Sequence, residues 1–230
     1  VEVLDDLDNS SHRLKEIPGL YFKHNGKLHF NPSTEIPIIL DDFPYPKREL
    51  IKLDDYFNAT SLRTMTTIYT SRGCPYKCSF CDVQDKTYHY RSTKSIVDEY
   101  EYIMSLGIKE IHVFDDTFNM GRKRVIDMSN EILNRGLKVN WSARVRAHPF
   151  DLEMLSIMKD SGCHQLQCGV ESLLPEALKN MKKKITLDHI RTFFSLTREA
   201  KIKTLGYFIL GFPEEDAKYR QRFYDEMMQL

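Results

Sequence analysis

Between residues 95 and 210 the sequence repeats one pattern four times, a stretch with helical hydrophobic spacing followed by a short apolar run. Gly107, Gly136 and Gly162 each end one of the predicted helices. The predicted helices are 95–106, 122–135, 152–161 and 187–200, and the strands that follow them are 110–114, 138–145, 164–170 and 203–210. A βαβ unit takes about 30 residues and joins parallel strands by a right-handed crossover. The repeat therefore predicts an α/β fold built on a parallel sheet.

Two further segments extend this repeat. The run 66–70 predicts a first strand, and Tyr219, Phe223 and Met227, spaced four residues apart, predict a fifth helix over 215–230. Five strands separated by helices indicate an open or partial (β/α) barrel, because a closed barrel of eight units takes about 250 residues. A doubly wound open sheet is the alternative fold.

Three cysteines stand in one short loop after the first predicted strand, with the spacing C-x3-C-x2-C: Cys74, Cys78 and Cys81. Thiolates are the ligands of iron–sulfur clusters and of zinc. No fourth cysteine follows in register, so three ligands on a [4Fe-4S] cubane leave one iron open to another molecule. The alternative is a zinc site completed by a histidine such as His89. Zinc sites usually draw their ligands from two separated pairs, and no second pair is visible, so the loop favours the cluster.

Polar residues recur where the predicted strands end, which is where ligands bind in parallel α/β folds. These residues are Asp115, Asp116, Ser142, Arg144, Arg146, Glu171 and Ser172. Each has a structural alternative: Asp115 or Asp116 could cap the next helix, and Arg144 could pair with Glu171. Because the same strand end is polar in every unit, we expect these side chains to share one binding site.

Three motifs and the cysteine loop together resemble one known family. The motifs are 114–118 (Phe-Asp-Asp-Thr-Phe), 169–172 (Gly-Val-Glu-Ser) and 208–213 (Phe-Ile-Leu-Gly-Phe-Pro), and Phe80 precedes the last cysteine of the loop. This arrangement is similar to that of the radical S-adenosylmethionine (SAM) enzymes, and in particular to the branch in which a cobalamin-binding domain often precedes the barrel. The resemblance covers residues 66–229.

The resemblance implies two cofactors and a role for each site residue. Cys74, Cys78 and Cys81 would bind a [4Fe-4S] cluster, and the open iron would be chelated by the methionine part of SAM. The other roles are as follows: Asp115 or Asp116 would accept the ammonium of SAM, Glu171 the ribose hydroxyls, Ser142 and Arg144 the ribose or carboxylate, and Phe80 and Gly211 would line the adenine. Most members of the family carry Gly-Gly-Glu where this chain has its paired aspartates.

The resemblance also implies a domain organisation. Residues 61–230 would form a radical SAM core, a partial (β/α)6-type TIM barrel truncated after the fifth unit. Residues 1–60 would form a β-hairpin and linker, the tail of a cobalamin-binding domain, and the first residue, Val1, suggests a piece of a longer protein. Asn25-Gly26 between two apolar runs is a strong hairpin signal. A hairpin unrelated to cobalamin is the alternative.

Composition limits the remaining possibilities. Lys plus Arg equals Asp plus Glu at 33 each, so no overall positive charge attracts nucleic acid. No apolar run approaches the ~20 residues that a transmembrane helix needs. Five cysteines, three of them clustered, fit a reducing cytoplasm, and we expect Cys163 and Cys168 to be buried small hydrophobes. The run from Lys179 to Lys184 contains four lysines and predicts a solvated helix end, with a phosphate-bearing substrate as the alternative.

These observations together predict a radical SAM enzyme that cleaves SAM reductively. Cobalamin-linked methyl transfer to a small molecule, or its rearrangement, is favoured over a tRNA methylthiotransferase-like activity. An electron donor such as a flavodoxin or ferredoxin would be its protein partner. A zinc-stabilised α/β binding module without catalysis is the alternative from another class of protein.

Overall fold

The computed structural model describes residues 13–24, 26–32, 39–58, 63–83, 85–212 and 215–230. The chain divides into two compact units, 1–38 and 39–230. Within the described residues of both units, no helix is both long enough and apolar enough to cross a bilayer.

The first unit contains a 3-10 helix, η1 (Arg13–Glu16), and two strands, β1 (Tyr21–His24) and β2 (Lys27–Phe30). The strands pair antiparallel, with Tyr21 opposite Phe30 and His24 opposite Lys27. The Tyr21 and Phe30 rings stack at 4.2 Å between centroids. Gly26 has a φ of 77°, as a tight turn requires, whereas Asn25 of the predicted Asn-Gly turn lies outside the described residues.

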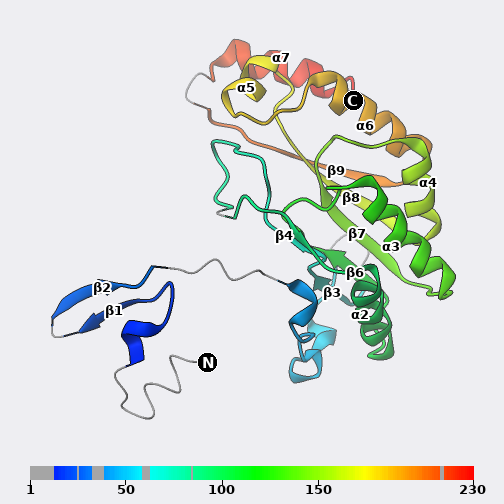
Figure 1. Ribbon diagram of the computed structural model, residues 1–230. Coiled ribbons are helices and arrows are strands. Elements are labelled where there is room, and N and C mark those ends of the chain that lie inside the picture. Colours follow the sequence, from blue (N-terminus) through cyan, green and yellow to red (C-terminus); the bar gives the residue numbers. More distant parts are fainter. Residues whose placement is uncertain (1–12, 25, 33–38, 59–62, 84, 213–214) are drawn as a thin grey trace. The chain divides into compact units, whose positions relative to one another are not determined.

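A five-stranded parallel sheet organises the second unit (Figure 1). Its order is β3 (Met65–Ile68), β6 (Glu110–Val113), β7 (Asn140–Val145), β8 (Cys163–Glu171) and β9 (Lys203–Phe208). The order follows the chain without a reversal, whereas a doubly wound sheet reverses at its switch point, so the alternative fold is wrong. The predicted α/β fold with a parallel sheet is confirmed.

The described part of the second unit contains six α-helices. They are α2 (Thr93–Ser105), α3 (Arg122–Asn134), α4 (Leu152–Asp160), α5 (Pro175–Asn180), α6 (Leu187–Glu199) and α7 (Ala217–Met227). Figure 1 shows α2, α3 and α4 side by side along the sheet, and α3 packs against both of its neighbours. Asp151 caps α4 by accepting a hydrogen bond from the Met154 amide. The short helix α5 begins at Pro175, a residue suited to the first turn.

Alternation along the strands gives the sheet two chemically different faces. On β6 and β7 the fully buried residues Ile111, Val113, Trp141 and Ala143 belong to the hydrophobic core. Cys163 and Cys168 of β8 are also fully buried in that core, as predicted. Burial raises the pKa of Cys163, and it raises the pKa of Cys168 to about 12, so both stay neutral thiols. On β6 and β7, the residues that alternate with these buried apolar ones carry the polar groups described below.

The segment 39–58 belongs to the second compact unit, which begins at residue 39. It contains three 3-10 helices, η2 (Leu40–Asp42), η3 (Arg48–Leu50) and η4 (Leu53–Asp55). Arg48 is buried, donates to the Thr67 carbonyl oxygen at 2.8 Å and forms an ion pair with the buried Glu99 of α2 at 2.7 Å. Through these contacts of Arg48, the segment 39–58 is attached to β3 and to α2.

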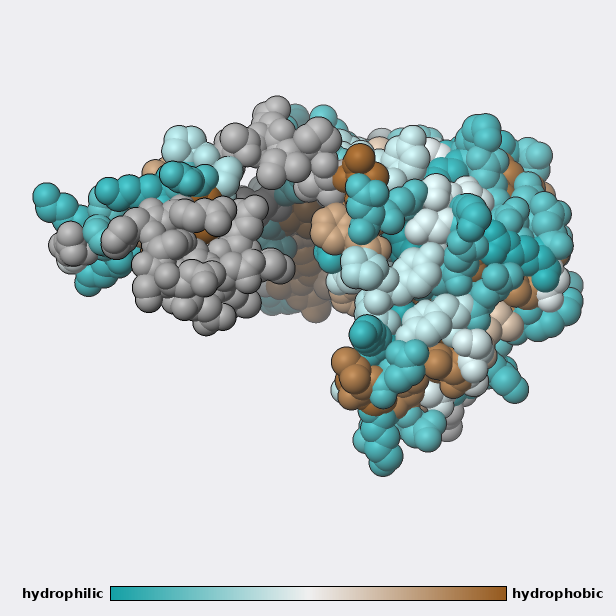
Figure 2. Space-filling model, turned by 60° about the horizontal axis from the view of Figure 1, so that its bottom comes forward, coloured by the Kyte–Doolittle hydropathy of each residue, from teal (hydrophilic) through white to brown (hydrophobic). Residues whose placement is uncertain are grey.

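On the face shown in Figure 2, hydrophobic residues reach the surface in separate groups among hydrophilic ones.

Candidate active site

The cysteine loop leaves the sheet through a two-stranded ladder and is fixed at three points. β4 (Ser71–Arg72) pairs antiparallel with β5 (His89–Tyr90) and closes the loop at its base. The Gly73 amide donates to Asp116 Oδ2 at 2.8 Å, and the Cys74 amide donates to the Asp85 carbonyl oxygen at 3.0 Å. The Ser79 amide donates to the Met181 carbonyl oxygen at 3.0 Å. Backbone hydrogen bonds therefore hold the loop at both its ends and its middle.

Gly73 is required at the entrance of this loop. Its φ is 84°, and a Cβ placed there would lie 1.8 Å from the Thr87 carbonyl oxygen. Any other residue would collide with the returning backbone of the loop. The glycine of the break before Cys74 is therefore a steric condition for closing the loop.

The three cysteines differ in exposure. Cys74 is buried, with Sγ 3.3 Å from Thr117 Oγ1, whereas Cys78 is half-buried and Cys81 is exposed. Among the described residues, no three side chains of His, Cys, Asp or Glu converge as a single metal ion requires. A cubane binds each thiolate through a different iron, so its ligands need not converge on one point.

The two aspartates after β6 have different surroundings. Asp115 is 1% exposed, and its carboxylate accepts hydrogen bonds from the Thr70 amide at 2.7 Å, the Ser71 amide at 3.1 Å and both hydroxyls of these residues. Arg124 Nη2 lies 3.7 Å from the same carboxylate. Asp116 is exposed, and among the described residues its carboxylate accepts a hydrogen bond only from the Gly73 amide. Asp115 therefore joins β3 to β6 beneath the loop, whereas Asp116 leaves an oxygen atom open.

Arg146, which follows β7, lies directly beneath the cysteine loop. Its Nη1 lies 3.9 Å from Cys78 Sγ, and its guanidinium covers the Tyr76 ring at 3.7 Å from the centroid. It also donates to the Lys183 carbonyl oxygen. The residue is 5% exposed, and its Nε has no hydrogen-bond partner among the described residues. A buried cation with an unused donor suits an anionic sulfur cluster, so the side chains of this loop fit the group that the cysteines predict.

Glu171 ends β8 in a left-handed conformation, with a φ of 66°. Its carboxylate is paired with Lys183 at 2.7 Å, and both side chains are buried. The structural alternative that paired Glu171 with Arg144 is therefore wrong. The prediction of a solvated lysine run holds for Lys179, Lys182 and Lys184, which are exposed, but fails for Lys183. Strained backbone of this kind is concentrated at functional sites.

Ser142 and Arg144 form a separate group with two residues of β6 and the segment after it. Ser142 Oγ lies 2.8 Å from His112 Nδ1, and the Arg144 guanidinium stacks on the Phe114 ring at 3.4 Å from the centroid. Burial, reinforced by the charge of Arg144, lowers the pKa of His112 to about 4, so this histidine is neutral at pH 7. Arg144 Nε is buried without a hydrogen-bond partner among the described residues.

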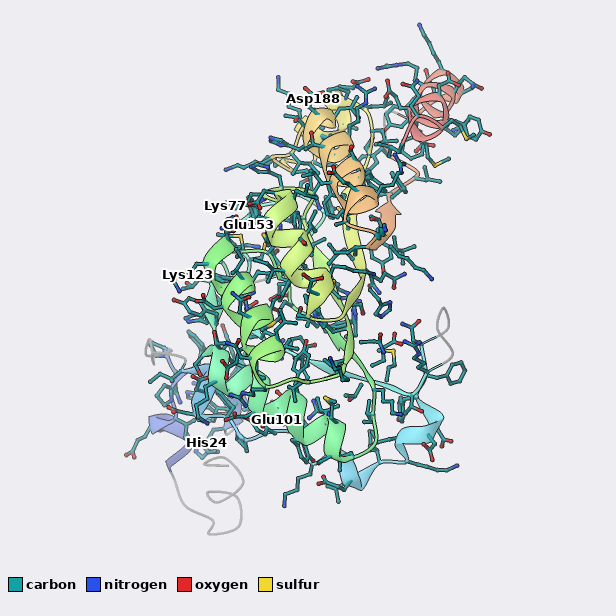
Figure 3. All side chains as sticks on the ribbon, turned by 90° about the vertical axis from the view of Figure 1, so that its right-hand side faces the viewer. His24, Lys77, Glu101, Lys123, Glu153 and Asp188 are labelled. Atoms are coloured by element: carbon teal, nitrogen blue, oxygen red, sulfur yellow. The ribbon has the colours of Figure 1, made fainter. Side chains whose placement is uncertain are left out.

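The structure brings most of the predicted residues to one end of the sheet. In Figure 3, Lys77 of the cysteine loop, Lys123 and Glu153 all lie on the side of the picture where α3 and α4 begin. Phe80 is 42% exposed, with its ring centroid 5.6 Å from Lys183 Nζ. Gly211 is exposed, and among the described residues its amide donates to Glu215 rather than to any predicted site residue.

The sequence placed Arg146 among the polar strand-end residues but assigned it no ligand, and it assigned no site role to Lys183; both residues lie against the cysteine loop. Arg146 shares the parity of Ser142 and Arg144, and this signal was sufficient to include it. Lys183 has no comparable signal, because it stands among other lysines and follows Glu171 by twelve positions.

The family model of the Radical SAM superfamily matches residues 68–227. This range includes the cysteine loop and the carboxyl ends of all five strands of the parallel sheet. The chain belongs to this superfamily. The predicted family and its cofactors, a [4Fe-4S] cluster and SAM, are confirmed by this match. The alternative of a zinc-stabilised binding module is not favoured.

Two methyltransferase sequences illustrate the similarity. An uncharacterised methyltransferase of Pyrococcus horikoshii is 35% identical over 222 residues, which cover 93% of this chain and 47% of that protein. The bacteriochlorophyllide d C-12(1)-methyltransferase of Chlorobaculum tepidum is 30% identical over 180 residues, which cover 75% of this chain and 39% of that protein. The chain therefore spans less than half the length of either relative.

Solved radical SAM structures share the fold. One is the radical SAM methyltransferase TsrM from Kitasatospora setae, with tryptophan and a SAM analogue bound. The match has a TM-score of 0.67 at 26% identity, and it covers 72% of this chain and 34% of the TsrM chain. The cobalamin-dependent SAM radical enzyme OxsB, with aqua-cobalamin and SAM bound, has a TM-score of 0.81 at 20% identity and covers 98% of this chain and 34% of that chain. At that identity the likeness to OxsB concerns the fold alone.

Proposed function

We propose that this chain is the radical SAM core of a cobalamin-dependent enzyme that transfers a methyl group to a small molecule. The observation that carries the proposal is the cysteine loop, anchored at the carboxyl ends of the strands in a chain of the radical SAM superfamily. The two methyltransferases reported above support methyl transfer. The cysteine loop and the motifs at 114–118, 169–172 and 208–213, which resemble the branch with a cobalamin-binding domain, support a link to cobalamin. Neither methyltransferase is named as acting on tRNA, and the equal numbers of basic and acidic residues give this chain no overall positive charge to attract it. Both observations disfavour a tRNA methylthiotransferase-like activity.

The fold proposed for residues 61–230 is a partial (β/α)6-type barrel with the polar residues on its concave side. Strand order that follows the chain, with helices between successive strands, supports this arrangement. Residues 1–60 would contain the hairpin and linker that lead from a cobalamin-binding domain. We place the enzyme in the cytoplasm, where its thiols stay reduced, with an electron-donating protein and a small-molecule substrate as partners.

Each residue has a defined task in this proposal. Cys74, Cys78 and Cys81 would hold the cluster, and Arg146 would offer its guanidinium to the Cys78 sulfur. When bound, the cluster supplies the electron that cleaves SAM to a 5′-deoxyadenosyl radical. Glu171, oriented by Lys183, accepts the ribose hydroxyls.

The remaining site residues hold the rest of SAM. Arg144 presents a buried, unused donor to its carboxylate, with Ser142 beside it on β7. Phe80 and Gly211 line the adenine, and both are exposed. Asp116, which keeps an open oxygen atom, accepts the ammonium group, whereas Asp115 holds the strands together.

Anaerobic reconstitution with iron and sulfide tests the proposal. We expect about four irons and four sulfides per chain, a brown absorbance, and 5′-deoxyadenosine formed from SAM under reduction. Iron, sulfide and product are measured on the same sample. One zinc per chain in a colourless protein, with no cleavage of SAM, would contradict the proposal.

The two aspartates give a sharper prediction. Asp116→Asn keeps an oxygen for the Gly73 amide but loses the charge, so we expect the dissociation constant for SAM to rise about tenfold or more at nearly unchanged stability. Asp115→Asn turns an amide group toward donors, so we expect it to lower the free energy of unfolding by about 2–3 kcal/mol. Equilibrium dialysis and urea unfolding measure the two effects. Reversed effects of the two substitutions would assign the ammonium to Asp115.

A further inference from the structure

The lysine run after α5 lies against the cysteine loop. The Ser79 amide donates to the Met181 carbonyl oxygen at 3.0 Å, and Arg146 bridges Cys78 to the Lys183 carbonyl. Lys183 Nζ lies 5.6 Å from the centroid of the Phe80 ring. Met181 and Lys183 therefore form one wall of the cradle for the cluster.

The other lysines of this run point away from the cradle. Lys179, Lys182 and Lys184 are exposed, and among the described lysines of the run only Lys183 forms an ion pair. Lys182 and Lys184 both have left-handed backbone, with φ of 54° and 55°. This alternation of conformations accompanies the burial of Lys183 between two exposed neighbours.

The three exposed lysines line a surface depression of about 590 Å³. Its apolar lining residues are Leu178, Ile185 and Leu187, and one acidic residue, Asp188, also contributes. Lys77 is a fourth exposed lysine, and it stands in the cysteine loop itself, beside Cys78. We call Lys77, Lys179, Lys182 and Lys184 the lysine rim.

The cluster loop reaches the surface next to this rim. Phe80 is 42% exposed and Cys81 is exposed. An electron that enters the protein for the cleavage of SAM has its shortest route where the loop meets solvent. A donor that docks there meets positive charge around an apolar depression, which suits a small redox complex steered by electrostatics.

We propose that the lysine rim is the docking surface for an acidic one-electron donor protein, which reduces the cluster through the exposed side of the cysteine loop. This inference rests on the proposed function, because it requires a cluster in the loop. An anionic substrate held by the same lysines is the competing outcome, and the experiment separates the two.

The test compares two reductants on the reconstituted full-length protein. Reduced flavodoxin is the acidic protein donor, and dithionite is a small reductant that needs no docking surface. In the Lys182→Glu/Lys184→Glu variant we expect the flavodoxin-driven formation of 5′-deoxyadenosine to fall about tenfold or more at low salt. The dithionite-driven rate and the iron content should stay within about twofold of the unmodified protein, since neither lysine touches the loop by its side chain.

Lys109→Glu/Lys138→Glu is the matched control, because both side chains are exposed and the two residues stand shortly before β6 and β7, at the end of the sheet opposite to the cysteine loop. It changes the charge by the same amount but away from the lysine rim, so the flavodoxin-driven rate should change little. Added salt should slow the unmodified protein and should affect the double variant less. Binding of oxidised flavodoxin, followed by calorimetry, should weaken in the double variant in the same proportion as the rate.

Three results would overturn the inference. An unchanged flavodoxin-driven rate in the double variant would place the docking surface elsewhere. An equal loss with both reductants, together with a raised KM for substrate, would assign the lysines to an anionic substrate. Normal flavodoxin binding in the double variant would show that the donor does not dock on the lysine rim. A protein that assembles no cluster and cleaves no SAM with dithionite would instead refute the proposed function, which the dithionite arm reads by itself.

Discussion

In the Cys78→Ala variant we expect the iron content after anaerobic reconstitution to fall from about four per chain to below about one. Cys78 is one of only three thiolates that the loop offers, and it is the one beside Arg146. Two remaining thiolates leave two irons of a cubane without protein ligands. SAM cleavage should fall below detection for the same reason. Iron analysis, visible absorbance and electron paramagnetic resonance of the reduced sample measure the loss.

Cys163→Ala is the control for this experiment. Cys163 is fully buried at the start of β8, and its thiol contacts the Gln165 carbonyl oxygen rather than the cysteine loop. The variant should be somewhat less stable but should assemble the cluster normally. Loss of iron in Cys163→Ala as well would mean that the cluster does not belong to the cysteine loop alone.

The Lys183→Met substitution should give the largest loss of stability. It leaves the Glu171 carboxylate buried at 8% exposure without its cation, and an uncompensated buried charge of this kind costs about 3–5 kcal/mol. Equilibrium unfolding in urea measures the change in the free energy of unfolding. Lys182→Met is the matched control. The Lys182 side chain is exposed, so this substitution should change the free energy of unfolding by no more than about 0.5 kcal/mol.

A double variant tests the reason for this effect. Glu171→Gln with Lys183→Met replaces the buried ion pair by neutral groups, so it should recover much of the stability lost in Lys183→Met. Equal destabilisation by Lys182→Met and Lys183→Met would contradict the buried pair. Failure of the double variant to recover would show that Lys183 stabilises the protein through contacts other than Glu171.

The hydrophobic pattern was sufficient to predict the architecture. Ile96, Tyr100 and Ile103 repeat with the helical period and are fully buried on α2, and the apolar residues of β6 and β7 are buried by alternation. Such periodicity reflects burial on one face, which is local information. The cysteine spacing was sufficient to predict the cofactor, because three thiolates in eight residues have few other uses.

Pairings between distant side chains were less predictable. Asp115 and Asp116 are equivalent in the sequence, but only Asp115 lies beneath Thr70 and Ser71. Arg144 was the structural partner considered for Glu171, whereas Lys183 takes that place because the loop after α5 folds back. The burial of Arg48 against Glu99, which assigns 39–58 to the second unit, likewise depends on tertiary packing. No periodic pattern encodes these contacts.

The cradle for the cluster is closed by the polypeptide alone. The hydrogen bonds that fix the loop come from the amides of Gly73, Cys74 and Ser79, and none of them involves a sulfur atom. A zinc finger, in contrast, obtains its folding free energy from the metal. We therefore expect the apoprotein to keep the backbone of this loop, so that iron lost on oxidation could be restored without refolding of the chain.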